Sequence, residues 1–137
     1  MTSITRVFIA MALPILAISL TPRAAMAQSY TGNWPITVSK SHYSNGTYCA
    51  ALTDDGNQGF PHSGPASLVP SNGYFGWFTV INGIVTVTIP EAYNGEFEFL
   101  VFVAHASDGR IGKGAFVLAG GPDDSGVAVF SAKNGCS

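Results

Sequence analysis

Charged residues are scarce in this sequence, and basic residues are the scarcest. Only 10% of the 137 residues are charged, with six lysines and arginines against eight aspartates and glutamates. A nucleic-acid-binding protein needs a basic patch that meets phosphates, and six dispersed basic residues do not supply one. The shortage of positive charge therefore excludes nucleic acid as an expected partner.

The sequence has only one long apolar run, and that run is too short for a membrane span. It covers residues 7–20, is interrupted by Pro14, and falls short of the roughly 20 residues that a spanning helix needs. Arg6 precedes it, and Ala25-Met26-Ala27 follows as an A-x-A cleavage site. We therefore predict a signal peptide over residues 1–27, cleavage after Ala27, export to the periplasm or beyond, and no membrane span in the mature chain.

The mature chain, residues 28–137, is long enough for a single domain. Cleavage would remove Arg6 and Arg23, so four basic residues would remain against eight acidic ones, for a net charge of −4. The remaining sequence has enough β-branched and aromatic residues to build a core, which argues against disorder.

Cysteine is nearly absent. The two cysteines, Cys49 and Cys136, do not form a C-x-x-C pair, which excludes the usual redox motif. In an oxidising compartment a lone pair is typically joined, so we predict a Cys49–Cys136 disulfide. Their Cα atoms must then lie within about 7 Å of each other, which places the end of the chain beside the second strand.

Helical periodicity is absent after residue 28. Short alternating apolar runs are separated by Gly, Asn, Asp and Pro clusters, which is typical of an antiparallel all-β domain. Because the linking loops are short, we expect a meander. The eight predicted strands cover residues 34–40, 47–53, 65–69, 74–81, 84–89, 96–104, 111–118 and 126–133.

The hairpin around Asn82-Gly83 has the strongest local signal. This pair favours a two-residue type I′ turn, which would place Ile81 opposite Ile84 and Phe78 opposite Val87. The strand over residues 96–104 begins with alternation that predicts Glu96 and Glu98 outward and Phe97 and Phe99 inward. In the hairpin, the predicted core face consists of Phe78, Val80, Val85, Val87 and Ile89.

The predicted disulfide favours a closed barrel over a sandwich. It brings the last strand to the first hairpin, and closure removes exposed strand edges. A barrel of about eight strands has room for side chains or for one small ligand.

Motifs for catalysis and metal binding are also missing. His42, His62 and His105 lack metal-ligand spacing, and we expect all three in or near solvated loops. The Asp-rich turns at 54–57 and 123–125 lack calcium-loop spacing, and no G-x-S-x-G elbow is present. Glu96 and Glu98 share a strand face but are expected to be too exposed to act as a glycosidase pair. We therefore expect no metal, no cofactor and no catalytic residue.

Aromatic side chains are the most distinctive feature that is present. Trp77 and Phe75 should face outward if Phe78 faces inward. Exposed aromatics beside Thr and Asn can stack on sugars or anchor a protein partner. The candidate binding surface consists of Trp34, Tyr43, Phe75 and Trp77.

Gly32-Asn33-Trp34 resembles the G-x-W motif that opens the first strand of lipocalin-like barrels. The small exported barrel inhibitors of bacterial metalloproteases begin similarly and also carry one disulfide. The resemblance implies that Trp34 closes a barrel end. The later T-D-Y triplet of lipocalins and the arginine after their last strand are missing here. The whole chain is also similar to short exported bacterial β-proteins with no assigned function.

These observations favour a small, exported, non-catalytic binding protein whose partner is a protein or a carbohydrate. One variant is a protease inhibitor that inserts residues 28–33 into its target. The alternatives are a structural protein that self-associates through residues 99–103, an enzyme, and an outer-membrane barrel. The last needs strands of about 9–11 residues, and most strands predicted here are shorter.

Overall fold

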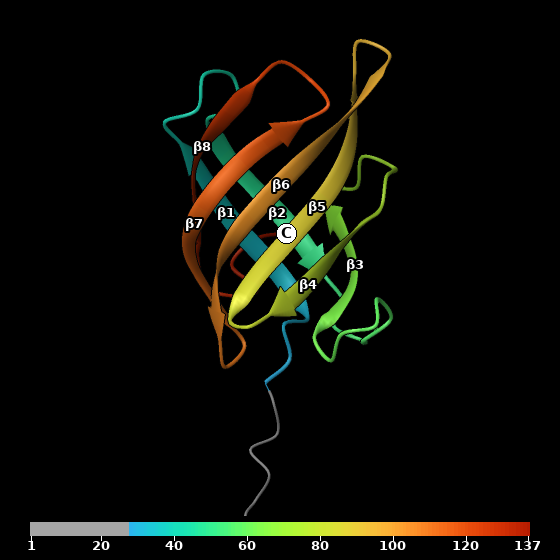
Figure 1. The fold of residues 1–137 in the computed structure, drawn as a ribbon, viewed down its shortest axis with the longest axis vertical. Coiled ribbons are helices and arrows are strands. Elements are labelled where there is room, and N and C mark those ends of the chain that lie inside the picture. Colours follow the sequence, from blue (N-terminus) through green and yellow to red (C-terminus); the bar gives the residue numbers. More distant parts are fainter. Residues whose placement is uncertain (1–27) are drawn as a thin grey trace, which may run out of the picture.

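The protein is an eight-stranded antiparallel barrel (Figure 1). The structure is a computed structural model that describes residues 28–137, so the predicted signal peptide lies outside the described residues. Each prediction of a strand is confirmed, with ends that differ by a few residues. The strands are β1 (Gly32–Ser39), β2 (Gly46–Leu52), β3 (Ser63–Leu68), β4 (Gly76–Ile81), β5 (Ile84–Tyr93), β6 (Glu96–Ser107), β7 (Arg110–Ala119) and β8 (Asp124–Phe130).

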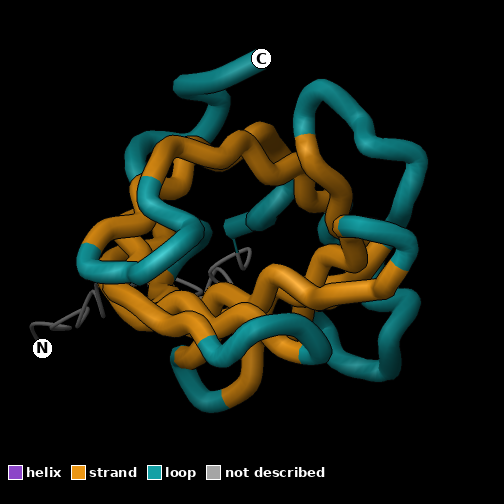
Figure 2. The backbone as a smooth tube through the Cα atoms, turned by 90° about the horizontal axis from the view of Figure 1, so that it is seen from above, coloured by secondary structure: helices purple, strands orange, loops and turns teal. Residues whose placement is uncertain are grey.

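The strands form a closed ring. Each strand pairs with the next one along the chain, and β8 pairs back onto β1, where Thr37 lies opposite Val129. Figure 2 shows this ring from above. The prediction of a meander closed into a barrel is therefore confirmed, and no strand is left with an unpaired edge along its whole length.

Three two-residue turns join the hairpins of the second half. Asn82-Gly83 has φ angles of 50° and 74°, as a type I′ turn requires, and Asn94-Gly95 and Asp108-Gly109 have similar values. The register across the first of these turns is as predicted, with Ile81 opposite Ile84 and Phe78 opposite Val87.

The disulfide between Cys49 and Cys136 is formed, with the two Cα atoms 5.9 Å apart. It ties β2 to the segment that follows β8, as predicted. Disulfides are typical of proteins that fold in oxidising compartments outside the cytosol.

Large apolar side chains fill the barrel. Trp34, Phe78, Phe102 and Phe116 are fully or almost fully buried, and the rings of Phe102 and Phe116 lie 5.5 Å apart. The predicted core face of the β4–β5 hairpin is confirmed, with Val80 packed at its margin. Because side chains occupy the centre, a ligand has access only to the ends or the outer wall.

Gly114 permits a close approach between β6 and β7. A Cβ at this position would overlap the carbonyl oxygen of Val103, so any larger residue would push the strands apart. The β6–β7 register shifts between Ala104 and Ala106, next to this contact. Gly112, two residues earlier on β7, has space around it.

The prediction for the faces of β6 was wrong. Phe97 is exposed and Phe99 is partly exposed, whereas Glu98 is buried with Leu100. The Asn94-Gly95 turn explains the difference, because it pairs Glu98 with Glu91 and Leu100 with the inward-facing Ile89. The register set by the turn therefore overrides the alternation at the start of the strand.

The barrel has two distinct ends. One end, which we call the upper end, lies toward the top of Figure 1. It is formed by the connections at 40–45, 69–75, 94–95 and 120–123. The lower end has the connections at 53–62, 82–83 and 108–109, together with the start of the described chain. Within residues 28–137 there is no helix suited to crossing a membrane.

Candidate ligand site at the barrel mouth

A cavity of about 520 Å³ opens at the upper end, and we call it the mouth cavity. Its walls come from the β1–β2 connection, β2, β5, β6, β7 and the β7–β8 connection. The lining residues are Tyr43, Ser44, Tyr48, Glu91, Tyr93, Glu98, Leu118 and Pro122.

Glu98 is the most unusual of these residues. It is only 5% exposed, and its carboxylate makes no hydrogen bond or ion pair with any other described residue. Within the described chain, every side-chain oxygen or nitrogen that is sealed from solvent has a hydrogen-bond partner. The Glu98 carboxylate has no such partner, so it is not sealed and keeps its solvent contact at the cavity. Gly121 lies against it, since a Cβ there would overlap the Oε1 atom.

Glu91 lies directly opposite Glu98 in the β5–β6 pair. Burial raises the pKa of the Glu91 carboxyl, and the negative charge of Glu98 raises it further. Both residues continue the inward faces of their strands past the apolar core, so the mouth cavity has a negatively charged wall.

Tyr48 connects the mouth cavity to the core. Its hydroxyl donates a hydrogen bond of 2.9 Å to the carbonyl of Ser44, and its ring lies 5.8 Å from that of Phe102. Burial raises the pKa of the Tyr48 hydroxyl, and the charge of Glu91 adds to this. Tyr48 therefore remains neutral and forms a fixed wall.

Two more tyrosines form the rim of the mouth cavity. Tyr43 lies in the β1–β2 connection and is 68% exposed, whereas Tyr93 ends β5 and is 61% exposed. Both rings are accessible to a ligand that enters the cavity.

Asp124 holds the β1–β2 connection in place. Its carboxylate accepts hydrogen bonds from the hydroxyls of Ser41 and Ser44, both at 2.7 Å, and from the amides of His42 and Tyr43. Burial alone would raise the pKa of Asp124, but these four hydrogen bonds outweigh it and hold the pKa well below its usual range. The sequence offered no sign of this role, because Asp124 lies about 80 residues away from its partners.

The acidic residues are concentrated at the upper end. Five of the eight lie in or next to its connections, and Lys40 is the one basic residue there among residues 28–137. None of the residues that line the mouth cavity is basic. The five acidic residues are Glu91, Glu96, Glu98, Asp123 and Asp124.

The structure separates the four aromatic residues predicted to form one surface. Tyr43 lies at the mouth cavity. Phe75 ends the β3–β4 connection and Trp77 lies on β4; both are exposed, and neither lines the cavity. The nearby Tyr74 packs edge-on against Phe97. Trp34 belongs to none of these surfaces. It is 2% exposed because it lies inside the barrel, where its indole nitrogen donates to the carbonyl of Tyr30.

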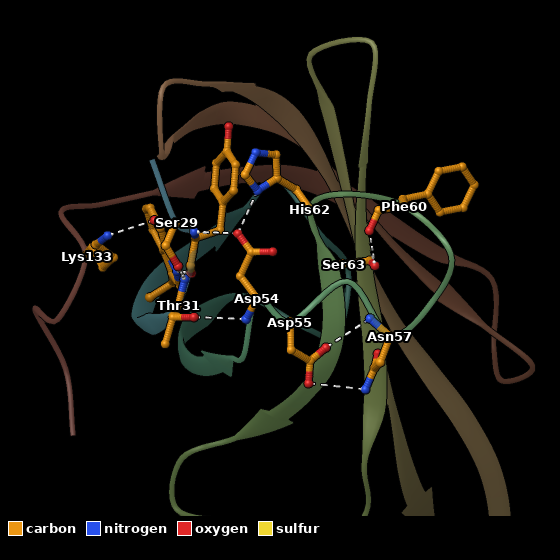
Figure 3. Close-up of polar contacts among 11 residues, drawn as sticks. Ser29, Thr31, Asp54, Asp55, Asn57, Phe60, His62, Ser63 and Lys133 are labelled. Atoms are coloured by element: carbon orange, nitrogen blue, oxygen red, sulfur yellow. Dashed lines mark hydrogen bonds and ion pairs between the residues drawn. The ribbon is translucent and has the colours of Figure 1, made fainter. Parts of the chain in front are cut away.

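His62 is bound to Asp54 at the lower end (Figure 3). The His62 Nδ1 lies 2.7 Å from an Asp54 oxygen, which also accepts the Tyr30 amide at 2.9 Å. No serine or cysteine side chain of the described chain is hydrogen-bonded to His62. The neighbouring Ser63 donates to the carbonyl of Phe60. The pair therefore fastens the start of the chain to the β2–β3 connection.

These contacts bear on two predictions. His42 is exposed in the β1–β2 connection and His105 is exposed near the end of β6, as predicted, whereas His62 is partly shielded in the β2–β3 connection. The segment over residues 28–33, predicted as an inserting arm, is held against the barrel, with Tyr30 buried.

Within residues 28–137, no three His, Cys, Asp or Glu side chains gather in a way that could hold a metal ion. In the Asp-rich turn of the β2–β3 connection, Asp55 instead accepts hydrogen bonds from Asn57, as turn residues commonly do (Figure 3). Comparisons with protein-family models, with curated proteins and with solved structures found no match.

Proposed function

We propose that this protein is an exported, non-catalytic binding protein and that the mouth cavity is its ligand site. The observation that carries the proposal is Glu98, a buried carboxylate that no described residue satisfies and that borders the cavity. The carboxylate has no protein donor and is open to the cavity, so its oxygens are free to accept hydrogen bonds from a ligand that enters.

The packing of the barrel is consistent with a site at one of its ends. The interior is filled by large side chains, so a small ligand cannot enter deeper than the mouth. The volume of about 520 Å³ is within the range of small-molecule sites.

Export is the second part of the proposal. The A-x-A motif at Ala25-Met26-Ala27 predicts cleavage after Ala27, and the Cys49–Cys136 disulfide suits an oxidising compartment. The protein would then meet its ligand in the periplasm or outside the cell.

A fragment screen by amide NMR tests the binding site. A library of neutral, anionic and cationic fragments is titrated into the ¹⁵N-labelled protein. The proposal expects hits that shift the amide signals of residues 43–48, 91–98 and 118–122. Hits that shift only residues around Phe75 and Trp77, or only the lower end, would contradict it.

One observation favours a second function, acid–base catalysis on a glycoside. The raised pKa of Glu91 beside the carboxylate of Glu98 is the pairing that such enzymes use. A panel of chromogenic glycosides tests this function. Hydrolysis that is lost in Glu91→Gln would support it, and no hydrolysis by the wild-type protein would rule it out.

A further inference from the structure

We infer that the ligand of the mouth cavity is an organic cation, in which an ammonium or guanidinium group is carried on an apolar stem. This inference rests on the proposed function, because it names the ligand class of the same site. It follows from three features of the cavity: its charge, its aromatic rim and its number of ligating groups.

Charge is the first feature. Glu91 and Glu98 face each other across one strand pair, and the lining has no lysine, arginine or histidine to balance them. A cationic donor placed between them would satisfy Glu98 and reduce the repulsion between the two carboxylates. An anion would add to that repulsion, and a neutral sugar would leave it in place.

Aromatic and apolar side chains are the second feature. Tyr43 and Tyr93 are exposed at the rim, and Tyr48 forms a neutral wall. Tyrosine ring faces attract cations, and Leu118 and Pro122 offer apolar contact for a hydrocarbon stem. This combination suits a cation that is organic and weakly hydrated.

The number of ligating groups is the third feature, and it separates an organic cation from a metal ion. The cavity has two carboxylates, and the described chain has no group of three acidic, histidine or cysteine side chains around one point. Calcium takes six to eight oxygen ligands. Two carboxylates are enough for an ammonium group, which has three donors.

The same chemical group could come from a free amine or from a lysine side chain of a peptide. Calorimetry with two probes distinguishes these sources, namely pentylammonium and N-acetyl-lysine methylamide. 1-Pentanol has the same stem without the charge, and calcium chloride supplies the metal control. The protein is used with its disulfide intact.

Glu98→Gln is the decisive variant, and Glu96→Gln is its matched control. Glu96 lies two residues earlier on β6, is exposed, and does not line the mouth cavity, so both variants remove one charge from the same end. We expect Glu98→Gln to weaken pentylammonium binding by about 10- to 100-fold. Glu96→Gln should change it by no more than about twofold.

Tyr93→Ala is an independent variant at an exposed position, where folding is not at risk. Loss of its ring should weaken binding of the cation by about two- to fivefold. The lysine probe binding at least as tightly as pentylammonium would indicate a peptide source, and weaker binding would indicate a free amine. Either result supports an organic cation.

Three results would overturn the inference: 1-pentanol binding as tightly as pentylammonium, calcium binding in its place, or equal losses in Glu98→Gln and Glu96→Gln. If pentanol still shifts the amide signals of the mouth, the proposed site stands and only the ligand class fails. If neither probe binds and no fragment shifts those signals, both proposals fail.

Discussion

Two carboxylates line the mouth cavity side by side. Glu98 is buried without a protein partner, and Glu91 lies directly opposite it. Burial and the charge of Glu98 both raise the pKa of Glu91, so the ionised form of Glu91 is costly to the folded protein. A carboxyl group whose pKa is shifted in this way at a cavity is a candidate for function.

Glu91→Gln should stabilise the protein at neutral pH. The pKa of Glu91 is raised on folding, so its contribution to stability is present below the ordinary value of 4.5 and is lost as the pH rises through the folded-state pKa. The variant cannot ionise and avoids this loss. Its thermal midpoint should exceed that of the wild type by up to a few degrees at pH 7, and the gap should close below about pH 4.5. A gap that widens as the pH falls would contradict this account.

Asp124→Ala should release the β1–β2 connection. Asp124 has a lowered pKa, so its contribution is present above the ordinary value of 3.8 and is lost as the pH falls below it. Hydrogen exchange at the amides of His42 and Tyr43 should become faster in the variant, because both donate to this carboxylate. Asp123→Ala removes the same charge one residue earlier, at an exposed position, and should leave both rates unchanged.

At the scale of strands and turns, the hairpin turns determine which residues reach the mouth. The Asn94-Gly95 turn pairs Tyr93 with Glu96, and from there the register brings Glu91 and Glu98 together. The sequence carries the signal for this turn, because Asn94-Gly95 is the same kind of pair as Asn82-Gly83. It did not predict the faces of β6, because apolar residues occupy both faces from Phe99 onward and the alternation at the start of the strand is opposite to the true one.

Gly83→Ala tests the turn chemistry. Gly83 has a φ of 74°, a conformation that alanine adopts only with strain, so the variant should lose about 1–2 kcal/mol of unfolding free energy in urea. Gly112→Ala is the control, since Gly112 has no positive φ and has space for a methyl group. Its effect should be close to zero or slightly stabilising. Equal losses in the two variants would show that the turn conformation is not the cause.

At the scale of the whole molecule, the fold could be predicted from local patterns. Alternation, turn pairs and one cysteine pair were enough to indicate eight strands, a meander and closure. The mouth cavity could not be predicted in the same way, because its lining comes from segments about 80 residues apart. Tyr43 was predicted as a binding residue from its aromatic character alone, and the carboxylates beside it become neighbours only in the folded barrel.

The disulfide should stabilise the closed barrel as a whole. It joins residues 87 positions apart, so replacing both cysteines by serine frees a long loop in the unfolded chain. We expect the double variant to lose about 2–5 kcal/mol of unfolding free energy, measured by urea denaturation. Reductant should lower the urea midpoint of the wild type in the same way. Reductant should have no effect on the double variant. A wild type whose urea midpoint does not respond to reduction would contradict this role.

The central claim is that Glu98 faces the mouth cavity and receives a cationic group there. The most direct measurement is ¹³C NMR of the glutamate carboxyl carbons during a titration with pentylammonium. The account predicts a saturable shift of the Glu98 signal, with a smaller shift for Glu91 and none for the exposed Glu96. Equal and unsaturable shifts of all three, or a shift confined to Glu96, would contradict it.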